Sequence, residues 1–402
     1  MSVRRAAALV AGGLLLLLGG RMLWIAAVAL ESQDQWDRQT LAQLRALSES
    51  PETLQAHADA MQARFPEGRL FTVALTGLAW RALAERHAVP LRDAERQVWA
   101  AVSLAEHDAT RRTFGPAGGL PHGLFYDAWT THLLLALSRP SPVWRDSLAR
   151  RCQRLHRVLD GDALWVDSYP GQAWPADAVV GAAALAGCGR LDPGHAETAR
   201  QWLGRVRQHL DPQTGLIPHA AGQPQVRGSS TALMSPFLAQ IDRRFARDQH
   251  LRFRRQFGAR LGGILPVRRE FMRGESQGGD IDSGPVVFGV SAPASVVGIA
   301  AARTGGDEAG AQALRATVEL LGVPVGTTRR HYAFGLLPVG DAFLAWASSV
   351  PMAPTQAPAS SDWRGRWVGA ALAGLVLGGW GVRYGSGGSS RARASTSGHR
   401  SR

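Results

Sequence analysis

A long series of amphipathic stretches constrains the fold of this chain more than any other feature. Between residues 31 and 363, apolar residues recur at helical spacing, and no alternating run of strand length competes with them. The stretches lie near 35–48, 54–65, 71–86, 91–106, 122–138, 142–159, 174–187, 193–210, 229–242, 244–259, 285–303, 306–320 and 339–349. First-turn prolines mark several of the expected helix starts: Pro142, Pro175, Pro193 and Pro285. The pattern predicts an all-α region of about six helical hairpins.

A short Gly-apolar-Pro element recurs between the expected helices. It occupies residues 119–121, 215–218, 263–266 and 335–338, and His122 and His219 follow the first two copies. The second and third copies are 48 residues apart, a length that suits one helical hairpin with its loop. Internal periods of this size are typical of repeat architectures. Chance recurrence in a chain rich in Gly and Leu is the alternative, but four copies between expected helices favour repetition.

The hairpin series resembles a known architecture. Together with the loops at 211–218 and 169–177, it is similar to the (α/α)6 toroid of six-hairpin glycosidases, over most of 35–349. Because apolar segments flank the series, the chain also resembles the linalool dehydratase/isomerase family, whose members use polar and thiol side chains for acid/base work on an alkenol. The resemblance implies an all-α fold, an (α/α)6 helical-hairpin toroid at 31–349 flanked by two transmembrane helices.

Two apolar segments bracket the helical series. The first lies within residues 1–30 and follows Arg4 and Arg5, whereas the second, at 367–383, precedes a basic Gly/Ser/Arg-rich tail at 384–402 that reads as disordered. Since positive charges favour the cytoplasmic side, both termini are expected in the cytoplasm. We therefore expect a bacterial inner-membrane protein whose main domain is extracytoplasmic and is joined to the second segment by a Pro-rich tether at 350–366.

Two details of these segments leave alternatives open. The Ala-Val-Ala sequence at 27–29 is compatible with a cleaved signal peptide as well as with an uncleaved anchor. Gly374 and Gly378 form a small-xxx-small pair that allows close helix approach, or one that a Gly-rich segment produces by chance.

The kind and position of the charges exclude several function classes. All 45 basic residues are Arg, so neither a Schiff-base Lys nor a Walker Lys exists. The basic excess lies at the two ends of the chain, which argues against a nucleic-acid partner. The Arg-rich stretch at 243–255 indicates the solvated face of an outer helix, with contact to acidic lipid or polysaccharide as the secondary interpretation. Since no metal or nucleotide motif is present, we expect no metal and no cofactor.

The densest group of acidic residues lies at 268–285. It contains Glu270, Glu275, Asp280 and Asp282. Crowded carboxylates separate one another's pKa values, as general acid/base catalysis requires. The alternative is that Asp280 and Asp282 cap the helix expected to start at Pro285.

Polar residues near other expected helix starts complete the candidate site. Asp177 follows Trp174 and would either cap its helix or take part in catalysis. The rings of Trp174 and Tyr169 would either stack on a sugar or pack in the core. His122, Tyr126 and Asp127 can share one helix face. An Asp inside an otherwise apolar helix is costly unless it is paired, which makes Asp127 a stronger candidate. The predicted catalytic residues are His122, Tyr126, Asp127, Asp177, Asp280 and Asp282. The predicted substrate-binding residues are Tyr169, Trp174, His219, Glu270 and Glu275.

The two cysteines, Cys152 and Cys188, either pair in an oxidising compartment or are small buried residues on successive helices.

Three functions remain open at this point. The first is a glycan-processing hydrolase or lyase that uses carboxylate acid/base chemistry. The second is a lyase or isomerase acting on a small hydrophobic alcohol, and the third is a non-catalytic binding protein of the cell envelope. We rank the glycan enzyme first, with a small-molecule or glycan substrate and membrane lipid as the expected partners.

Overall fold

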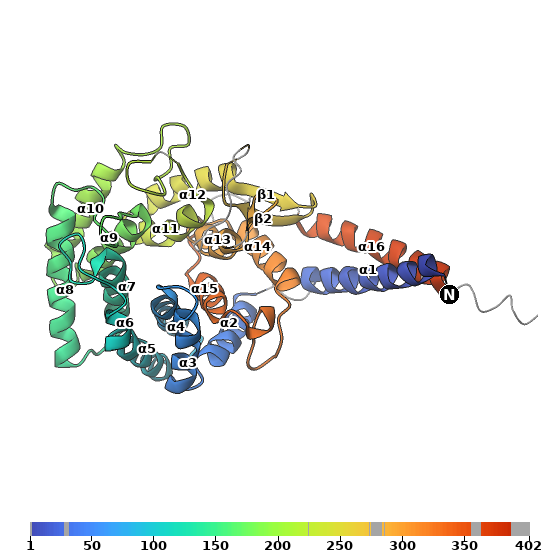
Figure 1. The fold of residues 1–402 in the computed structure, drawn as a ribbon, viewed down its shortest axis with the longest axis horizontal. Coiled ribbons are helices and arrows are strands. Elements are labelled where there is room, and N and C mark those ends of the chain that lie inside the picture. The colour runs from blue at the N-terminus through green and yellow to red at the C-terminus, as the bar shows by residue number, and fades with distance from the viewer. Residues whose placement is uncertain are drawn as a thin grey trace, which may run out of the picture. The chain divides into compact units, whose positions relative to one another are not determined.

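The computed structural model describes residues 2–27, 32–223, 225–272, 274, 284, 286–354 and 363–386. The described chain is mostly helical, as the periodicity predicted, with a few short strands (Figure 1). It divides into two compact units. The helical domain consists of Ser32–Leu261 and Pro266–Ser361, and a smaller unit holds the two chain ends with Gly262–Leu265.

The smaller unit contains two long helices, α1 (Val3–Ala27) and α16 (Trp363–Ser386), which pack along each other. Glycines allow the two backbones to approach closely. A Cβ added to Gly12 would lie 2.7 Å from the carbonyl oxygen of Gly378, and one added to Gly378 would lie 2.8 Å from that of Gly12. At Gly374, the other member of the small-residue pair, the nearest atom would be the carbonyl oxygen of Leu15 at 3.7 Å. Of the two glycines in the small-residue pair, Gly378 therefore makes the closer approach.

Among the described residues, α1 is the one helix that is long and apolar enough to cross a membrane. A signal sequence near an N-terminus has the same properties, so both alternatives from the sequence stay open. Helix α16, which carries Arg364, Arg366 and Arg383, does not reach the same apolar character. The described residues thus contain one possible membrane span, whereas the sequence predicted two.

Two kinds of helix alternate in the helical domain. Six of the described helices are apolar on most sides, and we call them the core helices: α4 (Gly68–Glu85), α7 (Gly123–Ala136), α9 (Pro175–Cys188), α11 (Gly228–Ile241), α13 (Ala292–Thr304) and α15 (Pro338–Ser349). The cover helices bury only one stripe. They are α2 (Gln33–Leu47), α3 (Pro51–Gln62), α5 (Leu91–Ala105), α8 (Pro142–Asp160), α10 (Pro193–Val206), α12 (Arg243–Phe257) and α14 (Glu308–Leu321).

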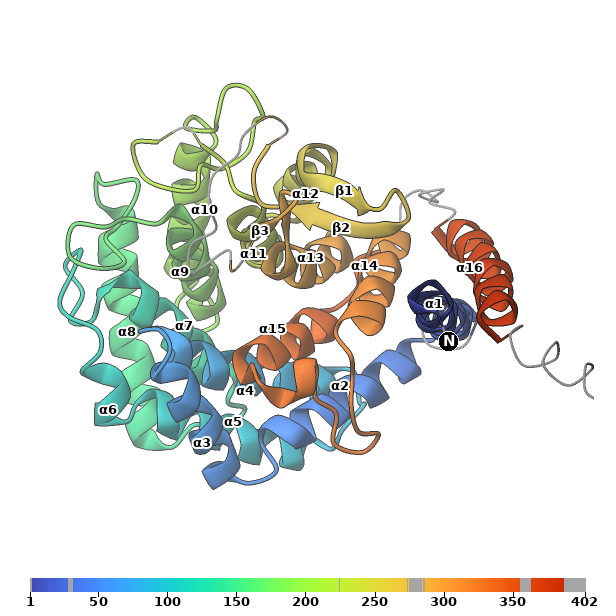
Figure 2. The same cartoon turned by 45° about the vertical axis from the view of Figure 1, so that its right-hand side comes forward.

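Each core helix packs against the next one along the chain, and α15 packs against α4, so the series closes on itself (Figure 2). Every core helix also has a cover helix packed on it. The pairs are α4 with α5, α7 with α8, α9 with α10, α11 with α12, α13 with α14, and α15 with α2. Because core and cover helices alternate along the chain as hairpins, successive core helices run in the same direction.

The connections contain two further helical turns, α6 (Asp108–Arg111) and η1 (Ala333–Gly335). The four Gly-apolar-Pro elements also lie in connections and share one backbone feature. Their glycines, Gly119, Gly215, Gly263 and Gly335, all have positive φ, between 67° and 76°, a region that Gly adopts without strain. Each element stands in the segment that leads into a core helix: α7, α11, α13 or α15. The recurrence in the sequence thus corresponds to a recurrent structural position.

The segment between α12 and α13 departs from the sequence prediction. It contains β1 (Gly258–Leu261), β2 (Leu265–Arg269), β3 (Val286–Val287) and β4 (Val290–Ser291), in the sheet order β1-β2-β4-β3. In β4, Ser291 pairs antiparallel with Arg268 on one side and with Val286 on the other. The helix expected at 285–303 therefore begins only at Ala292. The two-residue strands β3 and β4 are too short to show an alternating pattern, so periodicity did not predict them.

A disulfide joins Cys152 of α8 to Cys188 at the end of α9. The two Cα atoms are 5.9 Å apart, and both side chains are fully buried. Of the two alternatives that the sequence left open, the structure has the paired one.

Candidate functional site

Most of the residues selected from the sequence lie at the amino-terminal ends of the core helices. His122 is the N-cap of α7 and Trp174 is the N-cap of α9. Tyr169 and His219 lie in the loops that lead into α9 and α11, and Glu270 directly follows β2. Residues that are far apart in the sequence therefore share one kind of position, the entrance to a core helix.

The first turn of α11 connects several of these residues. Ser229 donates its backbone N–H to Oε2 of Glu270 at 3.2 Å and its hydroxyl to Oε1 at 2.7 Å. The next residue, Ser230, hydrogen-bonds through Oγ to Nδ1 of His219 at 2.6 Å. The centroid of the His219 ring lies 5.0 Å from that of Trp174. We call these five residues the α11 cluster, which brings together a carboxyl, an imidazole and an indole.

Glu270 combines complete burial with a specific set of hydrogen bonds. Burial raises the pKa of its carboxyl, although hydrogen bonds from Ser229 and Ser291 and the charge of Arg227 oppose that shift. A raised pKa keeps a carboxyl protonated closer to neutrality, which suits a general acid. The same carboxyl accepts the backbone N–H of Ser229 in the first turn of α11, so it also caps that helix.

Tyr169, the other predicted aromatic residue, contacts a second acid and further aromatic side chains. The hydroxyl of Tyr169 donates to Oε1 of Glu67 at 2.7 Å, and its ring stacks on Phe125 with centroids 5.8 Å apart. Phe125 in turn contacts Phe71 of α4 at a centroid distance of 5.0 Å. Sequence analysis missed Glu67, although its place directly before an apolar helix is the signal that selected Asp177.

The geometry favours a structural role for Asp127. It is fully buried and forms ion pairs with Arg151 at 2.6 Å and with Arg154 at 3.1 Å, both from α8. Arg151 also pairs with Glu106 at 2.7 Å. A carboxylate buried in an apolar helix is costly unless it is paired, and these contacts supply the partners. Asp127 thus holds α8 on α7 and lies outside the α11 cluster.

His122 and Tyr126 are neighbours, as the helical spacing predicted, with ring centroids 5.0 Å apart. The hydroxyl of Tyr126 donates to the carbonyl oxygen of Ala105 at 3.2 Å, and burial raises its pKa. Nδ1 of His122 lies 3.0 Å from the carbonyl oxygen of Phe114. Both side chains are therefore held by backbone groups of the preceding segment.

Of the four remaining predicted residues, the structure describes only Asp177. Asp177 is buried in the first turn of α9, where the helix dipole favours its anion. Glu275, Asp280 and Asp282 lie outside the described residues. Within the described part of the chain, no three His, Cys, Asp or Glu side chains are placed to hold a metal ion.

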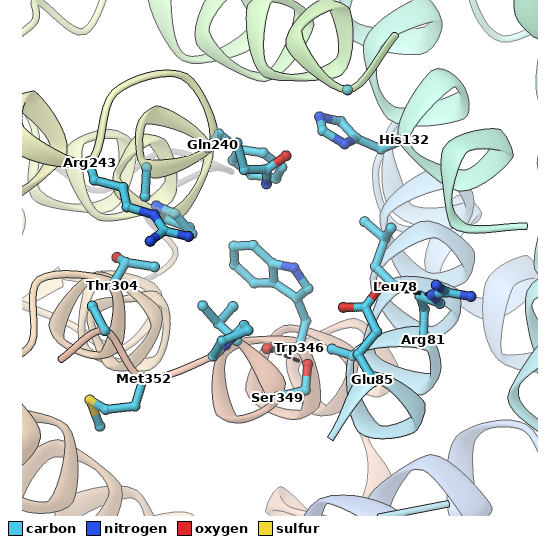
Figure 3. Close-up of a pocket in the computed structure, with 18 of the residues that line it drawn as sticks. Leu78, Arg81, Glu85, His132, Gln240, Arg243, Thr304, Trp346, Ser349 and Met352 are labelled. Atoms are coloured by element: carbon cyan, nitrogen blue, oxygen red, sulfur yellow. Dashed lines mark hydrogen bonds and ion pairs between the residues drawn. The ribbon is translucent and has the colours of Figure 1, made fainter. Parts of the chain in front are cut away.

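A cavity at the opposite ends of the core helices escaped the sequence analysis. Its volume is about 1210 Å³, and residues from the carboxy-terminal ends of the six core helices contribute to its wall (Figure 3). The start of α12 and residues 351–354 complete it. Its charged lining residues are Arg81, Arg190, Arg243, Arg244, Arg247 and Glu85. We call it the arginine cavity.

The Arg-rich stretch at 243–255 contained the signal for this cavity. We interpreted the whole stretch as a solvated face, but Arg243, Arg244 and Arg247 line the cavity, whereas Arg252 and Arg255 do not. Basic residues in the first turn of a helix oppose its dipole. That local conflict distinguishes the first arginines of α12 from those further along it.

His132, in the wall of the arginine cavity, should make the domain less stable in mild acid. Its Nε2 lies 3.0 Å from the carbonyl oxygen of Val180, and burial lowers its pKa to about 4. In the unfolded chain the pKa is about 6.5, so the unfolded state binds the proton first as the pH falls. The contribution of the neutral His132 ring to the free energy of unfolding is fully present above about pH 6.5 and is lost as the pH falls towards 4. The free energy of unfolding should fall by roughly 3 kcal/mol across this window.

Urea unfolding of the full chain in detergent at several pH values measures this effect. His132→Gln should show a distinctly smaller loss of stability on acidification than the wild type. His209→Gln serves as the control, because His209 is an exposed residue outside the cavity wall, and it should keep the wild-type profile. Identical profiles for all three proteins would rule out His132 as the source.

No known protein-family profile matches this chain, and no curated protein matches it.

Proposed function

We propose that the helical domain is an α/α toroid that acts on a glycan of the cell envelope through carboxylate acid/base chemistry. The closed series of core helices, each with a cover helix, supports the toroid. In such an architecture the segments entering the core helices gather at one end, and the α11 cluster consists of residues from such segments. Fold alone does not determine activity, so the chemical part of the proposal depends on the cluster.

Glu270 is the observation that carries the chemistry. Its carboxyl is buried, its pKa is raised by burial, and Ser229 holds both of its oxygens. In the proposed reaction the protonated carboxyl gives its proton to the glycosidic oxygen, so that the leaving group departs as a neutral alcohol. Trp174 and Tyr169 supply aromatic faces for the apolar side of a sugar ring.

A second carboxylate completes the proposed reaction. Hydrolysis needs an ionised partner that attacks the anomeric carbon or activates a water molecule. Among the described residues we assign this role to Asp177, because the amino terminus of α9 favours its charged form. Asp280 and Asp282 are the further candidates from the sequence, and they lie outside the described residues.

The proposal includes a place in the cell. We propose that α1 anchors the chain in a bacterial inner membrane and that the helical domain lies outside the cytoplasm, with α16 as a second membrane helix. Arg4 and Arg5 in the first turn of α1 and the arginines after α16 support this orientation. The disulfide of Cys152 and Cys188 supports it independently, because such bonds persist in oxidising compartments.

Replacing Glu270 with Gln should reduce glycan turnover by at least about 100-fold, because an amide cannot donate the required proton. Gln keeps an oxygen that accepts from Ser229, so the cap of α11 and the fold should survive. The measurement uses the full chain in detergent with polysaccharides extracted from bacterial envelopes. New reducing ends report hydrolysis, and ultraviolet absorbance of unsaturated sugars reports elimination.

Glu197→Gln is the matched control, since Glu197 is half exposed in an ion pair with Arg200 on the cover helix α10. It should retain full turnover. If Glu270→Gln is as active as this control, Glu270 is not the proton donor. If the wild type releases neither product from any envelope polysaccharide, the glycan function itself is wrong.

The aromatic cluster around Phe71 favours one alternative, a lyase or isomerase that acts on a small hydrophobic alcohol. The ring centroid of Phe71 lies 5.0–5.4 Å from those of Phe125, Trp129 and Phe343. Such a group of aromatic rings suits an apolar substrate. The disulfide removes both cysteines as thiols, so such an enzyme would have to use Tyr169 and Glu67 instead. Gas chromatography of an alkenol incubated with the protein would detect its dehydration product.

A further inference from the structure

The arginine cavity has the charge expected of an anion-binding site. Five guanidinium groups against one carboxylate give its wall a formal charge of +4. Two of the arginines have partners within the protein: Arg81 pairs with Glu85 at 2.8 Å, and Arg190 donates to the carbonyl oxygen of Leu135 at 2.5 Å. Arg247 also has an interaction within the chain. The surplus charge therefore lies with Arg243 and Arg244 of α12.

Arg243 and Arg244 are exposed at the first two positions of α12. In the described part of the chain, neither side chain has an ion-pair partner. Two neighbouring guanidinium groups repel each other. Asp242, the N-cap before them, directs its carboxylate to the backbone N–H of Phe245 and to Arg207. A carboxylate bound between them removes this repulsion, and the guanidinium fork matches a carboxylate in bidentate geometry.

Two other side chains in the wall indicate that the ligand carries hydroxyl groups. His132 and Trp346 are more than nine-tenths buried and point into the cavity from α7 and α15 (Figure 3). Because the carbonyl oxygen of Val180 accepts from Nε2 of His132, Nδ1 of the neutral ring is an acceptor. No described residue donates to that Nδ1 or accepts from the indole N–H of Trp346. Sugar hydroxyls both donate and accept, so they satisfy the two groups together.

The size and the apolar lining fit the same kind of ligand. The cavity volume of about 1210 Å³ is far larger than an inorganic anion needs and slightly exceeds the usual range of about 300–1000 Å³ for small-molecule sites. Leu78, Leu135 and Phe237 contribute apolar surface, which packs against the C–H faces of sugar rings.

We propose that the arginine cavity binds an acidic saccharide, with a carboxylate at Arg243 and Arg244 and with sugar hydroxyls at His132 and Trp346. The site is separate from the α11 cluster, because it lies at the other ends of the core helices. It does not depend on the proposed glycan turnover, since a binding site of this kind needs no proton donor.

Isothermal titration of the full chain in nonionic detergent with trigalacturonate tests the proposal at neutral pH and low salt. Trigalacturonate should bind at least about tenfold more tightly than neutral maltotriose, because only the former carries carboxylates. Arg243→Gln/Arg244→Gln should weaken trigalacturonate binding by about 100-fold, roughly tenfold for each charge-assisted contact. Arg255→Gln/Arg260→Gln removes the same charge from two exposed positions outside the cavity wall and should leave the affinity nearly unchanged.

Three results would overturn the proposal. The first is equal binding of trigalacturonate and maltotriose, and the second is unchanged binding in Arg243→Gln/Arg244→Gln. The third is displacement of trigalacturonate by an equal concentration of inorganic phosphate, which would identify a site for small anions. Glu270→Gln should bind trigalacturonate like the wild type whether or not it turns over any glycan, so failure at the α11 cluster is distinguishable from failure at the cavity.

Discussion

Replacing Arg151 with Met should destabilise the helical domain by about 3–5 kcal/mol. The guanidinium of Arg151 is buried and lies 2.6 Å from Asp127 and 2.7 Å from Glu106. Burial disfavours its charge, but the two carboxylates outweigh burial and raise its pKa. Met preserves most of the side-chain volume and removes the charge. Two carboxylates would then remain buried between α7, α8 and the end of α5, with only Arg154 still beside Asp127.

The effect is measured as the free energy of unfolding in urea, with the full chain in detergent. Arg154→Met is the matched control, because Arg154 contacts the same Asp127 at 3.1 Å while its side chain is 23% exposed. That variant should lose only about 0–1 kcal/mol, as partly exposed ion pairs do. Removing all three charges, with Arg151→Met, Asp127→Asn and Glu106→Gln, should recover part of the lost stability. Equal losses in Arg151→Met and Arg154→Met would contradict this account.

Asp127 illustrates what could be predicted from the sequence and what could not. Its position inside an apolar helix showed that it needs a partner, and the structure supplies Arg151. The identity of that partner depends on how α8 lies on α7, which periodicity does not specify. The sequence therefore identified correctly that burying the charge of Asp127 is unfavourable. We attributed this burial to a catalytic role, whereas arginines of the neighbouring helix α8 pair with the charge.

The positions of helices could be predicted where the apolar periodicity extends over many residues. Most core and cover helices begin and end within a few residues of the expected ranges, since burial against one face determines the pattern. The segment before α13 differs, because strands of two residues leave no pattern and tertiary pairing with β2 determines them.

The α11 cluster was predictable only in part. Trp174, His219 and Glu270 were selected individually, on chemistry and on their position before a helix. Ser229 and Ser230, which connect them, look like ordinary residues of a helix start. The arginine cavity was not predictable at all, because its wall combines the far ends of six helices that are separated by long stretches of sequence.

Loss of the disulfide between Cys152 and Cys188 should lower the free energy of unfolding by about 3–4 kcal/mol. The bond closes a loop over a sequence separation of 36 residues and ties α8 to the end of α9. Without it the unfolded chain has more conformations available, while the folded state loses little, because α8 and α9 also pack on α7. The stabilisation therefore comes mainly from the unfolded state.

Comparison of oxidised and reduced wild type measures this effect without removing an atom from the core. Both forms are unfolded in urea, and alkylation of the thiols verifies the redox state. Cys152→Ala/Cys188→Ala should resemble the reduced form and should lose somewhat more, because two buried sulfur atoms are also removed. Indistinguishable unfolding of the oxidised and reduced proteins would show that the bond contributes nothing to stability.

Alkylation of the cysteines in cells tests on which side of the membrane the domain lies. Because both side chains are buried, the reagent is added together with denaturant. Thiols that then react only after reduction mean that the domain folds outside the cytoplasm, whereas thiols that react without reduction would contradict the proposed orientation.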